Sequence, residues 1–349
     1  MLKITLFPRL AESPEQHSNP YIRDFVAALE ACEGVQVVNP ARRNPLLSIL
    51  LPRRWGDVFV FNWFESLPEF KYGWLQSLAG IWLVCMLRLT GRKVVWVLHN
   101  RENHTGRHRR LTHLLRRFIA RFSTLIITHA TDGVRIVQEQ YPYAAGRTHF
   151  VHHPTKDRLD MAPVVAAPAY DLLLWGHISR YKGVLEFVRF LHTAEGAGLR
   201  VCIAGRCASP ALRAELEAQL PPEVKYIARS VTFEELGALV AQSRFVLTPY
   251  SAQSVLSSGA LMDSLSFGAR VIGPDTGSFR DYASEPLLSV STFRTFDDIP
   301  RIVRGTAGRA ADREDYARFL HENDWNHFAA TLLRLLGAGP ADRPDTHTS

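Results

Sequence analysis

The feature that most constrains this chain is the regular alternation of short apolar runs with longer amphipathic stretches. In the first half, the apolar runs are residues 4–7, 35–38, 58–62, 94–99, 125–128 and 148–151. Helical patterns lie between them, at 21–30, 75–89, 107–122 and 133–140. Strands that are apolar throughout and separated by helices are typical of a parallel sheet covered on both faces. The pattern therefore predicts an α/β protein.

The alternation restarts after a segment rich in proline and alanine, residues 161–169. Further strands are expected at 170–175, 200–204, 224–227, 245–249 and 270–273, with helices at 184–194, 211–219, 233–241 and 259–267. A chain of 349 residues is also longer than one hydrophobic core usually serves. We therefore expect a Rossmann-like domain over 1–162, a second one over 163–320, a last helix within 321–337, and a disordered tail over 338–349.

The cysteines and the first residues bear on the compartment. The four cysteines form neither a metal-ligand pattern nor a redox pair, which favours a reducing cytoplasm. The opening sequence MLKITLFPRL has too short an apolar run for a signal peptide and is better interpreted as a first strand. These features predict a cytoplasmic protein.

The formal net charge of +7 is unevenly placed, because arginines crowd one stretch of the first half. They are Arg101, Arg107, Arg109, Arg110, Arg116, Arg117 and Arg121. Such a field attracts nucleic acid or an anionic membrane. No DNA- or RNA-binding motif accompanies it, so the membrane is favoured over nucleic acid, and a solvated arginine-rich face remains the alternative. The apolar segment 74–89 is too short to span a bilayer, and we expect a buried or membrane-touching helix.

A basic loop follows the strand expected at 170–175. It reads GHISRYKG and contains Gly176, Arg180 and Lys182. Open α/β sheets bind ligands at the carboxyl ends of their strands, and the helix after this loop presents free N–H groups. Two cations there suit a diphosphate leaving group, which gains charge as its bond breaks. A basic surface loop is the alternative.

A second small-residue turn follows the strand expected at 245–249. Ser257, Ser258 and Gly259 open a helix, as in backbone cradles that bind phosphate. Asp263 lies one turn into that helix, where its carboxylate would accept from a ribose hydroxyl. The pattern Ser-Ser-Gly is also a common helix start.

Polar residues follow two strands of the first half. Trp63 and Glu65 come after one strand, and His99, Asn100 and His104 come after another. A carboxylate or imidazole at such a position can deprotonate an acceptor hydroxyl, so Glu65 and then His99 are the candidate bases. Each could equally be a hydrogen-bonded structural group. Asn19 begins the first helix, where a capping role is the simpler interpretation.

Several of these stretches resemble a known enzyme family. GHISRYKGV is similar to the Gly–Arg–Lys–Gly loop of glycosyltransferases with two Rossmann-like domains, the GT-B fold. VLTPYSAQSVLSSGALMDSLSFGARVIGP is similar to their donor-binding strand, loop and helix. DVFVFNWFE, KVVWVLHNRENH and NPY resemble, more narrowly, the GDP-mannose-dependent β-mannosyltransferases of xanthan-type exopolysaccharide assembly.

The resemblance implies a GT-B fold with the last helix crossing back to the first domain. It implies no cofactor or metal, a nucleotide-sugar donor (GDP-mannose favoured), a lipid-linked saccharide acceptor and no nucleic acid. The enzyme would lie on the inner face of the cell membrane as a peripheral protein. Asn19, Trp63, Asn100 and His104 would bind the acceptor.

One departure from the family pattern bears on mechanism. Common retaining members carry two glutamates separated by seven residues, and the matching positions here are Val255 and Asp263. Since valine cannot replace the first carboxylate, the pattern favours an inverting reaction with a base from the first domain. The alternatives are a catalytically silent homologue that acts as a binding or scaffold subunit, and a nucleotide-sugar epimerase of the same fold.

Overall fold

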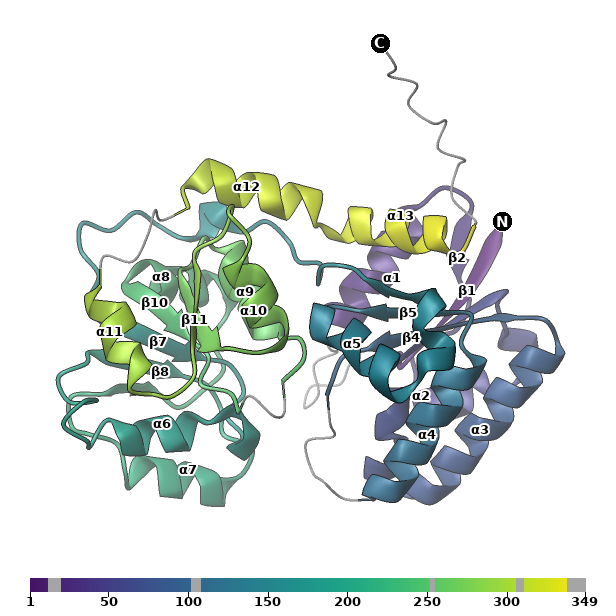
Figure 1. Cartoon of the computed structure of the whole chain (residues 1–349), viewed down its shortest axis with the longest axis horizontal. Helices are drawn as coiled ribbons and strands as arrows, with labels where there is room; N and C mark the ends of the chain where they lie inside the picture. Colours follow the sequence, from purple (N-terminus) through teal and green to yellow (C-terminus); the bar gives the residue numbers. More distant parts are fainter. Residues whose placement is uncertain (12–19, 102–107, 252–254, 306–310, 338–349) are drawn as a thin grey trace, which may run out of the picture.

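Two parallel sheets form the framework of the computed structural model, which describes residues 1–11, 20–101, 108–251, 255–305 and 311–337. Each sheet has six strands, in the orders β2-β1-β3-β4-β5-β6 and β12-β11-β10-β7-β8-β9. The two sheets occupy separate halves of the molecule (Figure 1). The α/β class and the two Rossmann-like halves are those that the alternation predicted.

The first half contains β1 to β6 and α1 to α5. Its strands are β1 (Leu2–Phe7), β2 (Val35–Val37), β3 (Val58–Asn62), β4 (Lys93–Leu98), β5 (Leu125–Thr128) and β6 (Thr148–Phe150). Its helices are α1 (Pro20–Ala31), α2 (Pro45–Ile49), α3 (Gly73–Leu89), α4 (Arg109–Phe122) and α5 (Thr131–Gln140). Short 3-10 turns are η1 (Pro52–Arg54), η2 (Phe64–Glu69) and η3 (Pro142–Arg147).

The second half contains β7 to β12. Its strands are β7 (Tyr170–Trp175), β8 (Val201–Ala204), β9 (Lys225–Ile227), β10 (Ser243–Leu247), β11 (Val271–Pro274) and β12 (Val290–Phe293). Its helices are α6 (Val184–Phe190), α7 (Pro210–Glu217), α8 (Phe233–Ala241), α9 (Gly259–Ser266), α10 (Gly277–Ala283), α11 (Asp298–Arg304) and α12 (Arg313–Glu322). The 3-10 turns η4 (Leu159–Met161) and η5 (Arg180–Lys182) complete it.

Alternating strand residues build a core on each face of the first sheet. Val58 and Val60 of β3 pack toward α1, whereas Phe59 and Phe61 pack toward α2, α3 and α4. Because both faces are buried, the strand is apolar at every position, which is why the sequence pattern identified it.

The last helix, α13 (Trp325–Leu335), crosses back to the first half. Its Trp325 and Phe328 rings lie 6.0 and 5.0 Å from the ring of Phe25 on α1. Lys93 at the start of β4 donates to the carbonyl of Leu336, at 2.5 Å. Figure 1 shows α12 and α13 spanning the two halves along one side of the molecule.

Some elements differ from the sequence prediction. The region 275–322 contains α10, β12, α11 and α12, for which the sequence analysis proposed no elements. The 75–89 prediction agrees closely with α3. Within the described residues, no helix combines the length and apolar character needed to cross a membrane.

Candidate functional site

An aromatic and histidine cluster forms the carboxyl edge of the first sheet. Trp63, directly after β3, adopts a left-handed backbone with φ of 53°. Its ring stacks on His99, directly after β4, with centroids 4.4 Å apart and planes 22° apart. Tyr21 of α1 meets the His99 ring edge-on at 4.9 Å. Because β3 and β4 are neighbours in a parallel sheet, the residues that follow them meet here.

The contact with Asn62 determines which ring nitrogen of His99 carries the proton. The Asn62 amide donates from Nδ2 to the carbonyl of Phe7 at 3.0 Å, which leaves Oδ1 to face His99. His99 Nε2 lies 2.9 Å from that oxygen and therefore donates to it. Burial lowers the pKa of His99 well below its ordinary value, with His129 and His153 adding to the effect. The ring is thus neutral, with Nδ1 as its unprotonated nitrogen.

Glu65 lies in a different environment from His99. It belongs to η2, its side chain is 0% exposed, and Trp96 of β4 donates to Oε2 at 3.1 Å. The Arg116 guanidinium of α4 lies 3.9 Å from Oε1. Burial raises the pKa of Glu65, and Arg116 opposes that rise. This geometry places the carboxylate inside the core below α4, whereas His99 lies at the sheet edge.

A pocket of about 510 Å³ lies in the first domain, and residues that contact or follow His99 line it, although His99 itself is not among the lining residues. Its lining includes two of the residues predicted to bind an acceptor, Trp63 and Asn100, together with Asn62 and Phe70. Arg9 and Arg23 also line it. The remaining predictions for the acceptor, Asn19 and His104, lie outside the described residues.

The basic loop after β7 closes on the neighbouring strand. Gly176 and Gly183 have φ of 100° and 69°, which glycine adopts readily. A Cβ on Gly183 would stand 1.9 Å from the carbonyl of Pro249, so no larger residue fits there. The Lys182 ammonium lies 5.6 Å from the centre of the Tyr250 ring. The loop therefore packs tightly against the segment after β10.

Arg180 differs from Lys182 in its exposure. Its side chain is 66% exposed and pairs with Glu215 of α7 at 2.5 Å. Arg180 also lines a cavity of about 720 Å³ at the carboxyl ends of β10, β11 and β12, with Tyr250, Phe293 and Arg294. The two cations that were predicted to act together are thus close in sequence but have different neighbours: Lys182 lies beside Tyr250, and Arg180 pairs with Glu215.

The turn before α9 reaches the first domain. Ser258 is the N-cap, since its hydroxyl accepts from the N–H of Leu261 at 3.2 Å. Ser257 instead donates its hydroxyl to the carbonyl of His99 at 3.2 Å. This contact joins the predicted donor loop, which continues into Gly259, directly to the edge that carries the candidate base.

Asp263 faces the segment that connects the two domains. Arg158 of that segment donates to Oδ1 at 3.3 Å and also to the Ser266 hydroxyl. Burial raises the pKa of Asp263 to about 6, and Arg158 opposes this rise. Asp263 is not among the residues that line either pocket described above.

Sequence reasoning did not single out Asn62, Arg116 or Asp132. Asn62 ends an otherwise apolar strand, and this break in the apolar run is a usable signal. Arg116 was grouped with the surface arginines, but it is 3% exposed and lies inside the fold. Within the described residues, no group of histidine, cysteine and carboxylate side chains is arranged to hold a metal ion.

Comparison with known proteins identifies relatives by sequence. No protein-family model matches the chain. It is 29% identical over 279 residues to the GDP-mannose:glycolipid 4-beta-D-mannosyltransferase of Xanthomonas campestris pv. campestris, which covers 78% of this chain and 75% of the relative. A second protein of that name from the same pathovar gives the same identity and coverage. The resemblance drawn from the motifs is therefore confirmed.

Solved structures identify the fold. Sucrose-phosphate synthase from Thermosynechococcus elongatus superposes with a TM-score of 0.69 at 14% identity, covering 97% of this chain and 98% of that one. Anabaena HepE in complex with UDP gives a TM-score of 0.65 at 13% identity, covering 97% and 100%. The glycosyltransferase AviGT4 gives 0.59 at 16% identity, covering 96% and 97%. The chain has the GT-B fold.

Proposed function

We propose that this GT-B chain is a glycosyltransferase that moves a hexose, with mannose favoured, from a nucleotide diphosphate sugar to a lipid-linked saccharide. The observation that carries the proposal is the contact between Ser257 and the backbone carbonyl of His99, because it brings the donor loop of one domain to the residue of the other that carries the candidate base. The similarity to mannosyltransferases that act on a glycolipid supports the choice of donor and acceptor.

His99 is the favoured base on the acceptor side. Its Nε2 is held by Asn62, so Nδ1 is the nitrogen that can take the proton of an attacking hydroxyl. Trp63 and Asn100 border the pocket beside it, where a flat ring and an amide suit a saccharide. Glu65 is the weaker candidate of the two, since its carboxylate is 0% exposed and is engaged by Trp96 and Arg116 in the core. His99 is also buried, at 4% exposed, but residues next to it line the pocket. Attack from the face opposite the leaving group would invert the donor's anomeric centre.

Lys182 and the start of α9 are favoured on the donor side. The diphosphate gains negative charge as the glycosidic bond breaks, and an ammonium with free helix N–H groups stabilises that charge. Arg180 is already paired with Glu215, so its contribution requires a change of partner. With these groups, we propose a reaction that needs neither a metal ion nor an organic cofactor.

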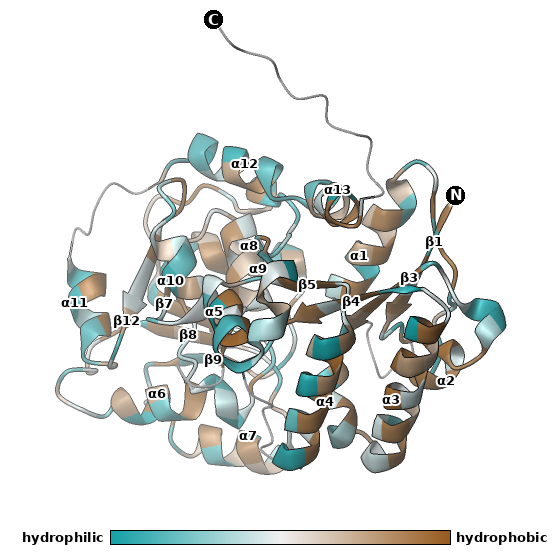
Figure 2. Cartoon of the chain, turned by 45° about the vertical axis from the view of Figure 1, so that its right-hand side comes forward, coloured by the Kyte–Doolittle hydropathy of each residue, from teal (hydrophilic) through white to brown (hydrophobic). Residues whose placement is uncertain are grey.

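The surface of α3 and α4 suits a membrane holding the acceptor. Trp74, Leu78 and Trp82 of α3 are 65%, 55% and 46% exposed. The neighbouring helix α4 exposes Arg109 and Arg117. Figure 2 shows α3 as hydrophobic along most of its length and α4 as alternating between hydrophilic and hydrophobic. Apolar side chains flanked by cations are the combination that binds an anionic bilayer surface. We therefore propose a peripheral protein at the inner face of the cell membrane.

A transfer assay tests the function. The purified protein is given GDP- and UDP-hexoses with lipid-linked saccharides, with and without EDTA, and the product's anomeric proton is read by NMR. We expect GDP-mannose to be used, EDTA to have no effect and the product to be β-linked. An α-linked product would exclude inversion, and transfer restored only by added metal would exclude the metal-independent mechanism.

A catalytically silent homologue is the second candidate. Two observations favour it: Val255 replaces the first carboxylate of the common pattern, and Asp263 is held by Arg158. A silent homologue would bind a nucleotide sugar, measured as thermal stabilisation, without hydrolysing or transferring it. Turnover of any donor separates the two candidates.

A further inference from the structure

The loop after β4, residues 99–101, is held from inside the first domain. Arg116 of α4 donates from Nη2 to the carbonyl of Asn100 at 2.8 Å and from Nη1 to the carbonyl of Arg101. A guanidinium is a planar fork that can bond two neighbouring carbonyls at once. Arg116 thus fixes the backbone directly after His99.

Glu65 explains why a buried arginine can occupy this place. An isolated buried cation is costly, whereas one with a carboxylate and further hydrogen bonds is tolerated. Glu65 lies 3.9 Å from Arg116, and Trp96 bonds its other oxygen. Glu65 therefore supplies the counter-charge for Arg116, whose guanidinium bonds the loop carbonyls.

The same loop is tied to the second domain through Asp132 of α5. Arg101 donates from Nη2 to Asp132 Oδ2 at 2.8 Å. That oxygen also accepts from the backbone N–H of Gly277, the first residue of α10, at 3.0 Å. In return, Asp281 of α10 accepts from the N–H of Thr131, the first residue of α5, at 2.8 Å. Each helix start is therefore bonded by a carboxylate of the other domain.

We propose that Arg116 and Arg101 are positioning residues for His99: Arg116 holds the His99 loop within the first domain, and Arg101 joins it through Asp132 to the start of α10. The inference rests on the proposed role of His99. Since Ser257 of the second domain donates to the His99 carbonyl, residues of both domains hydrogen-bond this loop. Contact between the two domains then completes the positioning of the base.

Arg101→Met is the main test, because this side chain is 36% exposed. The buried Asp132 would keep the guanidinium of Arg280 and the N–H of Gly277 as partners. We expect kcat to fall about tenfold while the donor KM changes by less than about twofold. Arg101→Lys should recover part of kcat, since an ammonium can still reach Asp132. Arg116→Lys should lower kcat as well, because it keeps the charge beside Glu65 but loses the fork.

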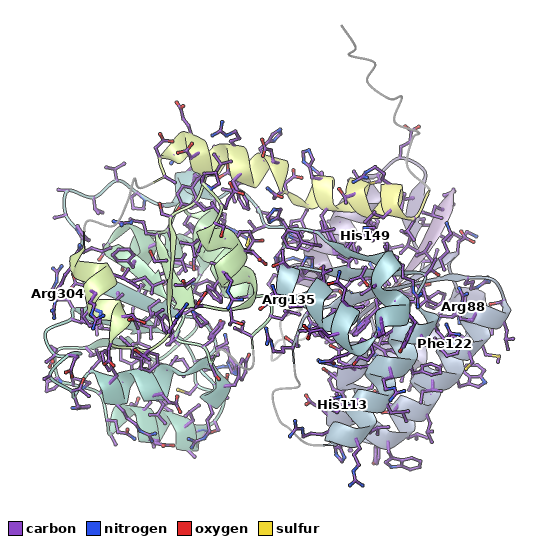
Figure 3. The ribbon with its side chains drawn as sticks, viewed as in Figure 1. Arg88, His113, Phe122, Arg135, His149 and Arg304 are labelled. Carbon is purple, nitrogen blue, oxygen red and sulfur yellow. The ribbon has the colours of Figure 1, made fainter. Side chains whose placement is uncertain are left out.

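Arg135→Met is the matched control. Arg135 also lies near Asp132, at 3.4 Å from Oδ1, but it is 62% exposed, and among the described residues it makes no hydrogen bond to the loop. Figure 3 shows it on α5 at the side toward the second domain. Its removal should leave kcat unchanged. Equal losses in Arg101→Met and Arg135→Met would overturn the proposal, as would a wild-type kcat in Arg101→Met.

Hydrogen exchange separates this inference from the proposed function. In Arg101→Met, the amides of residues 99–101 and of Gly277 should exchange faster than in the wild type, and in Arg135→Met they should not. If the wild type transfers no sugar, the proposed function fails. The exchange rates in Arg101→Met still decide whether Arg101 joins the loop to the start of α10. Unchanged exchange in Arg101→Met would overturn the inference whatever the activity.

Discussion

The carboxyl ends of the strands of the two sheets, here called the first and the second edge, differ in their packing and charge. The edge of the first sheet is a packed cluster of rings, in which Tyr21 meets His99, His129 and His153 at centroid distances from 4.9 to 5.7 Å. The edge of the second sheet is a loop with glycines at positive φ and an exposed cation, Arg180. One edge fixes the direction of an uncharged group, and the other presents charge on adaptable backbone. Substitutions should therefore affect stability at the first edge and turnover alone at the second.

Glu65→Gln should give the largest effect on stability. It removes the carboxylate beside the buried Arg116, and breaking such a pair costs about 3–5 kcal/mol in the free energy of unfolding. Urea unfolding followed by tryptophan fluorescence measures it, with the exposed Glu223→Gln in the second domain as control. A second substitution, Arg116→Met, should restore stability but not kcat. If Glu65→Gln were as stable as the wild type and inactive, Glu65 would be the base instead.

His99→Gln should give the largest effect on turnover, together with a loss of stability, because the imidazole packs against the rings of Trp63 and Tyr21. Glutamine keeps a polar side chain but cannot take a proton, so kcat should fall by about a hundredfold or more. Binding of GDP, measured by calorimetry, should be nearly unchanged. Retention of full activity would move the base to another residue of this edge.

Lys182→Ala tests the second edge. We expect at least about tenfold lower turnover and an unchanged unfolding midpoint, because the side chain stabilises charge that develops in the reaction. Arg180→Ala should have a smaller effect, since Arg180 is engaged by Glu215. The reverse order of the two variants would assign the diphosphate to the 720 Å³ cavity that Arg180 lines.

The smallest expected effect per residue concerns the membrane. Replacing Arg109 or Arg117 of α4 with serine should weaken binding to anionic vesicles by about 1 kcal/mol each, and less at high salt. Trp74→Ser should weaken it independently of salt. Arg304→Ser on α11 of the second domain is the control (Figure 3). Vesicle co-sedimentation that ignores lipid charge and salt alike would make this face an ordinary solvated surface.

The fold could be predicted because its strands are buried on both faces. Such strands, β3 for example, are apolar at every position and stand out between amphipathic helices. The strand β12 escaped because three of its four residues, Val290 to Thr292, are only partly buried and two of these are polar. An edge strand of this kind carries little of the signal that burial creates.

The sequence predicted those parts of the candidate site that directly follow a predicted strand. His99 and Trp63 follow neighbouring parallel strands, so their meeting follows from topology. The direction of the Glu65 side chain does not follow from topology, since the left-handed backbone of Trp63 and the η2 turn lead this side chain into the core. Arg116 was misassigned for a similar reason: a run of arginines on a helix does not reveal which one faces inward.

The double crossing between domains limits how this molecule can move. The chain passes from the first sheet to the second after β6 and returns between α12 and α13, and a bridge between Thr155 and Asp324 pairs the two passages. Two domains joined by two adjacent chain segments can rotate about the hinge line through those segments, whereas twisting and separation of the domains are restricted. The main relative motion left to the two domains is therefore a change in the angle between them, which one pair of fluorescent labels can follow. A chain ended before α13 would lose one of these two connections and uncover Phe25, so shortened forms must keep that helix.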